Sequence, residues 1–133
     1  MSASIICPCG SGDTFAACCG ALHGGRPAAT AEALMRSRYT AFATGDTAYL
    51  LRTWHPTTRP KRLDLDDTTT WKRLVITGHT DGALFHRTGT VSFAAHYERS
   101  GRRGVQAETS RFVREQDQWF YVDGVADADS SRS

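Results

Sequence analysis

The feature that most constrains this chain is a cluster of cysteines near its N-terminus. All four cysteines lie between positions 7 and 19, in the string Cys7-Pro8-Cys9-Gly10-Ser11-Gly12-Asp13-Thr14-Phe15-Ala16-Ala17-Cys18-Cys19-Gly20. A segment this short cannot bury a sufficient core, so something other than apolar packing must hold it together. A Cys-x-Cys pair, a glycine-rich turn and a Cys-Cys pair can deliver four thiolates to one tetrahedral ion. The spacing predicts a closed, structural zinc site formed by Cys7, Cys9, Cys18 and Cys19.

Two alternatives to a metal site are a pair of disulfides and four thiols without an ion. The start of the chain bears on this choice, because Ser2 to Ile6 lacks the basic and long apolar regions of a secretion signal. No apolar run approaches the length of a membrane span. We therefore expect a cytoplasmic protein, in which thiols stay reduced and a metal is favoured over disulfides. His23 is a potential substitute ligand, but four cysteines already fill the coordination shell.

The cysteine string resembles the SEC-C motif, a zinc knuckle found at the C-terminus of the SecA translocase and in many other bacterial proteins. The match covers Cys7, Cys9, Gly10, Ser11, Gly12, Phe15, Cys18, Cys19 and Gly20. In SecA the knuckle docks a chaperone and the ribosome, so the resemblance implies a protein partner for the knuckle of this chain. The lysines that usually flank the aromatic residue of the motif are replaced by Asp13, Thr14, Ala16 and Ala17. This replacement argues against a basic docking surface.

Two helices are expected after a linker at residues 24–27. Thr30 is a good N-cap, helical periodicity continues from Ala31 to Thr44, and Gly45 supplies a stop. Arg38 falls in the middle of the apolar face, whose other members are Ala31, Leu34, Met35, Ala41 and Phe42. A second helix, capped by Asp46, is expected from Thr47 to about His55. Residues 57–70 are expected to form a solvated loop with a turn near Asp66-Asp67.

The rest of the chain has the two-residue alternation of antiparallel strands. Strands are expected at 71–77, from 83 or 90 to 99, at 105–114 and at 119–123, with turns at 79–82, 101–104 and 116–117. A four-residue loop at 101–104 places Tyr97 opposite Glu108 and Phe93 opposite Phe112. The face that results contains Val91, Phe93, Ala95, Tyr97, Glu108, Ser110, Phe112, Tyr121 and Asp123.

This sheet face is apolar apart from a few residues, and the helix face that must cover it carries Arg38. A buried guanidinium needs an acceptor and a buried carboxylate needs a donor, because unpaired burial of either is heavily penalised. We therefore predict an Arg38–Glu108 ion pair inside the domain. The prediction depends on the register of the hairpin, since a shift by one residue would turn Glu108 outwards.

The strings at residues 34–42, 49–56 and 108–112, together with the knuckle, resemble the YchJ family over about residues 7 to 124. The family joins an N-terminal SEC-C knuckle to a domain like nuclear transport factor 2. The resemblance implies an α+β fold with a short zinc knuckle at 1–24 and a cone-shaped domain at 28–124. In such a domain a curved antiparallel sheet packs on N-terminal helices around one cavity. Residues 125–133 are small and polar, and are expected to form a disordered tail.

Two classes of function fit these features. The first is a non-enzymatic, zinc-stabilised protein that docks a protein partner through the knuckle or binds a small-molecule ligand in the cavity. The second is a small-molecule enzyme of the dehydratase or isomerase kind, with Arg38 as anion anchor and His55 and Glu108 as acid and base. Tyr39, Trp54, Trp71 and Tyr97 are candidate walls of the cavity, and Ser110, Tyr121 and Asp123 are further candidates for its lining. The alternative is that Arg38, Glu108 and Asp123 form a structural ion pair and that the tryptophans are core.

Charge sets limits on the partners of this chain. Its formal net charge is +2, from 16 basic and 14 acidic residues. Four thiolates on one zinc ion add about −2, so the total falls near zero. Without a net positive charge or a basic and aromatic stripe, the sequence argues against nucleic acid as a partner. We expect a monomer that does not engage a membrane.

Overall fold

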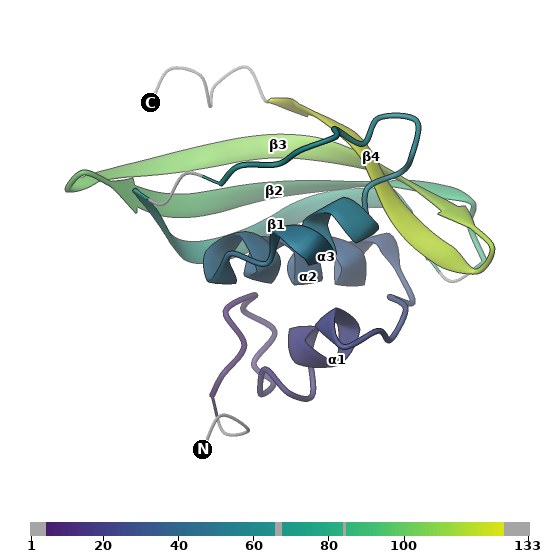
Figure 1. Ribbon diagram of the computed structural model, residues 1–133, viewed down its shortest axis with the longest axis horizontal. Helices are drawn as coiled ribbons and strands as arrows, with labels where there is room; N and C mark the ends of the chain where they lie inside the picture. Colours follow the sequence, from purple (N-terminus) through teal and green to yellow (C-terminus); the bar gives the residue numbers. More distant parts are fainter. Residues whose placement is uncertain (1–4, 66–67, 84, 127–133) are drawn as a thin grey trace.

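The computed structural model describes residues 5–65, 68–83 and 85–126 of the chain. These residues form three layers, namely a four-stranded antiparallel sheet, two helices packed on one of its faces, and the cysteine segment beyond those helices (Figure 1). The fold is therefore α+β, with a short N-terminal cysteine region ahead of a sheet-and-helix domain. The predicted turn at Asp66-Asp67 and residues 127–133 of the predicted tail lie outside the described residues.

The longest helix, α2, has the predicted bounds, Ala31–Thr44. Thr30 is its N-cap, because its hydroxyl oxygen accepts a hydrogen bond from the Ala33 amide at 3.1 Å. At the other end Gly45 adopts a left-handed conformation with φ of 80°, and its amide donates to the Ala41 carbonyl. Both ends are thus set by local sequence signals.

Helix α3, Thr47–Arg52, is shorter than predicted. Asp46 caps it as expected, accepting from the Tyr49 amide at 3.0 Å. Beyond Arg52 the backbone pairs with the sheet instead of continuing the helix: the His55 amide donates to the Tyr121 carbonyl at 2.7 Å, and the Tyr121 amide to the Thr53 carbonyl at 2.8 Å. This pairing fixes Trp54 beside the sheet.

The sheet is a meander of β1 Thr69–Asp81, β2 Thr88–Arg99, β3 Arg102–Glu115 and β4 Gln118–Ala126, in that spatial order. The strands are longer than predicted. The first strand continues through the expected turn at 79–82 and stops at Gly82, whose φ is 80° and whose carbonyl accepts from the Ala31 amide at 3.0 Å. The last strand includes residues 125 and 126, which were predicted to belong to the tail.

The predicted hairpin between β2 and β3 is wrong in its turn and its register. The loop consists of Ser100 and Gly101 alone, with φ of 53° and 79°, so Arg99 pairs with Arg102. Two positive φ values in a two-residue loop are typical of a type I′ turn, whose twist matches that of the strands. Tyr97 therefore lies opposite Gly104, and Glu108 lies opposite Phe93. Relative to the prediction the pairing moves by four residues, an even number, so Glu108 keeps its expected face.

The pairing of β3 with β4 agrees with the prediction near the turn and departs from it further on. Phe112 pairs with Tyr121 as expected, but a bulge follows and Asp123 pairs with Arg111 instead of Ser110. The Thr58 hydroxyl donates to the Val122 carbonyl at 2.6 Å, so the loop after α3 binds the strand at the bulge. Asp123 is consequently turned to the outer face of the sheet.

The main core lies between α2 and the sheet. It contains Leu34, Met35 and Tyr39 of the helix together with Leu74, Val91, Phe93, Ala95, Phe112 and Trp119 of the strands. A smaller cluster of Ala41, Tyr49 and Leu50 joins α2 to α3. None of the described helices is long and apolar enough to cross a membrane.

Candidate metal centre and ligand cavity

The four cysteines converge as a metal site requires. Cys7, Cys9, Cys18 and Cys19 are all free, and their Sγ atoms lie within 4.8 Å of one another. A tetrahedral zinc ion with bonds of about 2.3 Å places its sulfur ligands about 3.8 Å apart. The Sγ atoms of Cys9 and Cys18 are 3.6 Å apart, and those of Cys18 and Cys19 are 3.9 Å apart. The residues present therefore fit such an ion, and the disulfide alternative finds no support among these free thiols.

Local backbone structure accounts for this convergence. Gly10 and Gly12 have φ of 85° and 90°, a conformation that L side chains rarely adopt, and they turn the chain between the two cysteine pairs. Helix α1, Cys19–His23, begins at the last cysteine and carries it into the interior. Three of the four thiols are buried, and Cys18 is half-buried.

The electrostatics of the cluster are those of a cation site. The hydrogen bond from Cys19 lowers the pKa of Cys9 to about 4, and the same contact raises the pKa of Cys19. Burial raises the pKa of Cys18. Among these three sulfurs the shifts favour the thiolate at Cys9, and a divalent ion would favour ionisation of its other cysteine ligands as well.

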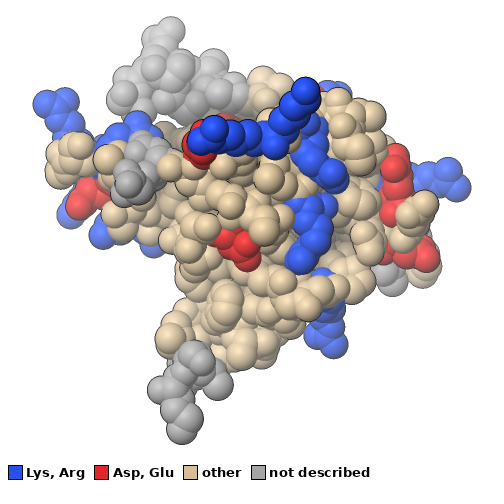
Figure 2. All heavy atoms as spheres, in the orientation of Figure 1, with Lys and Arg blue, Asp and Glu red and all other residues tan. Residues whose placement is uncertain are grey.

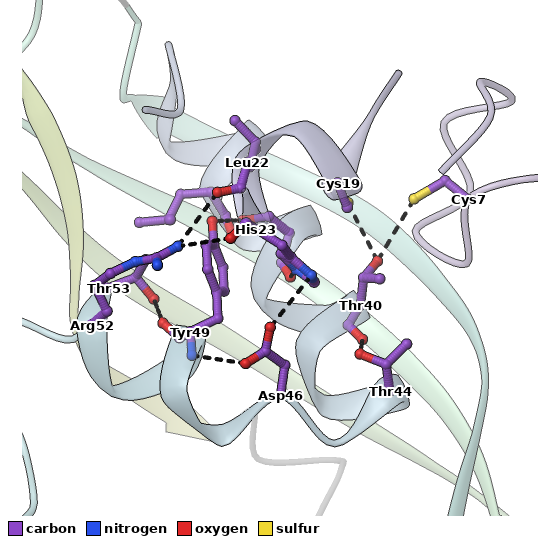
Figure 3. Close-up of polar contacts among 12 residues, drawn as sticks. Cys7, Cys19, Leu22, His23, Thr40, Thr44, Asp46, Tyr49, Arg52 and Thr53 are labelled. Carbon is purple, nitrogen blue, oxygen red and sulfur yellow. Dashed lines mark hydrogen bonds and ion pairs between the residues drawn. The ribbon is translucent and has the colours of Figure 1, made fainter. Parts of the chain in front are cut away.

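The cysteine segment is attached to the domain through helix α2 (Figure 3). The buried Thr40 hydroxyl lies 3.3 Å from Cys19 Sγ and 3.8 Å from Cys7 Sγ. Arg36 donates to the Cys9 carbonyl at 2.8 Å. His23, the potential substitute ligand, points away from the sulfurs: its Nε2 lies 2.9 Å from the Ser37 carbonyl and its ring 4.3 Å from that of Tyr49. The knuckle is therefore a layer of the domain and not a tethered appendage.

A second site is a cavity of about 250 Å³ on the opposite side of α2, between this helix and the sheet. Its apolar wall is formed by Met35, Tyr39, Phe42, Trp54, Trp71, Phe93, Ala95 and Tyr121. Its polar residues are Arg38, Gln106, Glu108 and Ser110. Arg38 and Ser110 are buried whereas Gln106 is exposed, so the cavity has a polar closed end and an open mouth.

The predicted Arg38–Glu108 ion pair is absent from the described part of the chain, although both residues line the cavity. Arg38 Nη1 donates to the Leu50 carbonyl and to Thr53 Oγ1, each at 2.7 Å, and its guanidinium lies 4.4 Å from the centre of the Tyr121 ring. Glu108 Oε1 instead accepts from Gln106 Nε2 at 2.6 Å. Arg38 is only 3% exposed and burial lowers its pKa to about 10, which still leaves it charged at neutral pH. A buried cation that pairs with no carboxylate among residues 5–65, 68–83 and 85–126 therefore borders this cavity.

Three candidate lining residues lie elsewhere. His55 lies against Phe120, with Nδ1 2.7 Å from Thr57 Oγ1 and Nε2 3.0 Å from a Glu115 oxygen, in a direction unsuited to a hydrogen bond. The Tyr97 ring lies over Gly104, and a Cβ on Gly104 would lie only 2.5 Å from the Tyr97 hydroxyl. Asp123 forms an ion pair with Arg111 on the outer face, with Oδ1 2.6 Å from Nε. The proposed acid and base, His55 and Glu108, are therefore not brought together.

Sequence reasoning missed five residues of the lining. Met35, Phe42, Phe93 and Ala95 fall on the predicted apolar faces, and an apolar pattern does not distinguish a cavity wall from a core. Gln106 is the fifth residue, and its spacing of two residues from Glu108 places it on the same face of the strand. That spacing is the sequence signal that could identify Gln106 as a lining residue.

Surface charge does not concentrate into one broad patch on the visible face. Basic side chains form a narrow stripe on that face, and acidic groups lie on either side (Figure 2). Two arginines near α3 have structural contacts, because Arg52 donates to the His23 carbonyl at 3.2 Å and Arg59 to the Trp54 carbonyl at 3.0 Å. These side chains help to hold α3 and its loop in place.

Family profiles match two parts of the chain. Residues 30–124 match the YchJ middle NTF2-like domain, and residues 6–21 match the SEC-C motif. A UPF0225 protein of Streptomyces coelicolor is 56% identical over 119 residues, which cover 89% of this chain and 93% of the relative. A UPF0225 protein of Corynebacterium glutamicum is 49% identical over 122 residues, covering 91% and 97%. Each of these alignments covers about nine-tenths of this chain.

Two solved structures have the same arrangement. The solution structure of a SEC-C motif-containing protein from Rhodopseudomonas palustris is 35% identical, covers 91% of this chain and 98% of its own, and superposes with a TM-score of 0.80. The crystal structure of a SEC-C motif-containing protein from Psychrobacter arcticus is 26% identical, covers 95% and 85%, and superposes with a TM-score of 0.77. Their names state a motif and no activity.

Proposed function

The chain belongs to the YchJ family, and from this premise we propose that it is a zinc-stabilised protein whose cavity binds a small anionic ligand. Zinc has a structural role in this proposal, because four thiolates leave no open coordination position for water or substrate. The protein acts as a binding module and not as an enzyme. The separation of His55 from the cavity removes the acid–base pair on which the dehydratase or isomerase alternative depended.

The ligand proposal rests on the unused hydrogen-bond donors of the buried Arg38 guanidinium. A guanidinium has five N–H groups, and Nη1 supplies the two that bind Leu50 and Thr53. Within the described residues, Nε and Nη2 donate to no protein group. A buried charge without a counter-ion is costly, and an anion entering the cavity would supply both the charge and the acceptors. The aromatic walls favour a flat apolar body attached to that anion.

Benzoate is a suitable probe, because it combines a carboxylate with a single ring and the cavity lies just below the range of about 300–1,000 Å³ for ligand pockets. We expect benzoate to raise the melting temperature of the zinc-loaded chain, by an amount that grows with the logarithm of the ratio of benzoate concentration to its dissociation constant. Methyl benzoate, which lacks the charge, should bind at least tenfold more weakly. The Arg38→Met variant should lose this preference. Equal binding of both probes to both proteins would overturn the proposal.

The identity of the metal is tested by elemental analysis of protein purified without chelators. We expect one zinc ion per chain, and less than a tenth of that in the Cys9→Ser variant, since removal of one ligand opens a closed shell. Protein without stoichiometric metal, or with a different metal, would contradict this part of the proposal.

A second candidate function, docking of a protein partner through the knuckle, is favoured by two residues. Ile5 and Ile6 are 57% and 60% exposed on the segment that leads into the cysteine cluster, whereas the other side of the knuckle is occupied by α2. A partner bound by the wild-type chain should be released by the double variant Ile5→Ser, Ile6→Ser, with benzoate affinity retained as the control. A partner that binds both proteins equally would exclude this surface.

A further inference from the structure

The cavity contains a second polar site next to the guanidinium. Three oxygens, Glu108 Oε2, Ser110 Oγ and the Tyr121 hydroxyl, lie 3.2, 3.3 and 3.4 Å from the point where a Cβ on Gly124 would be. Glycine at this position leaves that point open, because any side chain would press on all three oxygens. These residues come from adjacent strands, β3 and β4, on the face that α2 covers. We call the space that these three oxygens surround the Gly124 niche.

The oxygens of the Gly124 niche are not used by the protein itself. Among the described residues, none of the three makes a hydrogen bond, although Ser110 is only 2% exposed. The other oxygen of the carboxylate, Glu108 Oε1, is held by Gln106, and this bond fixes the orientation of the group. None of the three oxygens is closed off from solvent, so each can form a hydrogen bond with a group that enters the cavity.

The chemistry of the three oxygens specifies that group. An ionised Glu108 can only accept a hydrogen bond, whereas the hydroxyls of Ser110 and Tyr121 can donate or accept. Burial raises the pKa of Tyr121, so its hydroxyl keeps its proton at neutral pH. A ligand hydroxyl satisfies this set, because it can donate to Glu108 and accept from one of the two hydroxyls. An ammonium group would bring a second positive charge next to the Arg38 guanidinium, and a carboxylate would be repelled by Glu108.

We infer that the ligand of this cavity is a small planar hydroxy acid, with its carboxylate on Arg38 and its hydroxyl in the Gly124 niche. The inference rests on the proposed ligand-binding function and adds a second recognition element to it. Tyr121 connects the two sites, since the face of its ring lies against the Arg38 guanidinium and its hydroxyl borders the niche. The aromatic walls between them accommodate the ring of the ligand.

The test compares benzoate with 2-, 3- and 4-hydroxybenzoate, each titrated calorimetrically into the zinc-loaded full-length chain. The quantity of interest is the ratio of the benzoate dissociation constant to that of the tightest hydroxybenzoate. A hydrogen bond to a charged group contributes enough to make this ratio about ten or more. In Gly124→Ala, whose methyl group fills the niche, and in Glu108→Gln, which removes the charge, the ratio should fall towards one.

This ratio of dissociation constants distinguishes loss of the niche from general damage to the fold. Asp123→Asn is the matched control, because this neighbour of Gly124 faces the other side of the sheet and should leave the ratio unchanged. A variant that damages the fold weakens both probes and does not by itself lower the ratio. If benzoate binds but no isomer exceeds it by more than twofold, or if the gain survives in both niche variants, the inference is overturned. If no aromatic acid binds at millimolar concentration, the proposed function fails as well.

Discussion

Asp123 illustrates how one residue can carry a perturbed pKa without belonging to a site. The hydrogen bond from Arg111 lowers the pKa of Asp123, but the pair is on the outer face of the sheet, and the Arg111 side chain is 63% exposed. Exposed ion pairs contribute little to stability because solvent screens them. The Asp123–Arg111 ion pair therefore contributes little to the stability of the fold.

We predict that Asp123→Asn leaves the urea midpoint at pH 7 unchanged within error. A carboxylate whose pKa is lowered in the folded state stabilises the protein above its unfolded pKa, and this contribution is lost as the pH falls through the folded pKa. Any difference between variant and wild type should therefore shrink below about pH 4, near the ordinary pKa of the side chain. Urea unfolding at pH 7 and pH 3 measures this. A large loss of stability at pH 7 would show that the side chain does more than the ion pair indicates.

Thr40 of α2 contacts the cysteine sulfurs directly. Its hydroxyl lies within 3.8 Å of two of them and the residue is fully buried. Groups in this position orient metal ligands, and their removal commonly lowers metal affinity by about 10- to 100-fold. We predict a loss in this range for Thr40→Val, measured by competition with a chelator. Thr40→Ser, which keeps the hydroxyl, should remain close to wild type, and an equal loss in both variants would indicate a packing effect instead.

At the scale of elements, the hairpin between β2 and β3 offers a test of the turn assignment. Ser100 has φ of 53°, a conformation in which asparagine is far more common than serine. We predict that Ser100→Asn raises the free energy of unfolding by a few tenths of a kcal/mol, whereas Gly101→Ala lowers it by about 1 kcal/mol. Chemical denaturation of the two variants measures both signs. A four-residue loop at 101–104 would leave Ser100→Asn without effect.

The same hairpin shows which parts of this fold are readable from sequence. The bounds of α2 follow from Thr30 and Gly45, because caps act on their own backbone neighbours. The loop at 101–104 was misassigned because it has a glycine at each end, and only the structure shows that Gly104 makes room for the Tyr97 ring. Residue alternation still placed Glu108 on the inner face, since the error in register was even.

The errors at the candidate site have a different origin, namely contacts between segments that are distant in the sequence. Asp123 leaves the inner face because Thr58, from a distant loop, binds the strand at residue 122. The residues next to Asp123 in the sequence give no signal for the bulge. Arg38 lacks its predicted carboxylate because the end of α3 offers it a carbonyl and a hydroxyl. The cysteine cluster was readable for the opposite reason, since all of its ligands lie within one short segment.

For the molecule as a whole, helix α2 is the element shared by both sites. One side of it contacts the knuckle through Arg36, Ser37 and Thr40, and the other lines the cavity through Met35, Arg38 and Tyr39. The knuckle in turn has only a small buried cluster, of Cys7, Cys9 and Cys19, to hold it together without a metal. The cysteine cluster is thus positioned to support the wall of the cavity.

We therefore predict that removal of zinc destabilises the entire chain and not the knuckle alone. When the sulfurs repel or protonate, the knuckle loosens and α2 loses the packing on its outer side, so the domain should unfold in one transition at a lower temperature. Hydrogen exchange should accelerate in α2 more than in the centre of β2 and β3, whose ladder does not involve the knuckle. Calorimetry and hydrogen exchange of the chelated protein measure this, with restoration by zinc but not by magnesium as the control. A chelated chain that keeps its melting temperature and its affinity for benzoate would mean that the two sites are energetically independent.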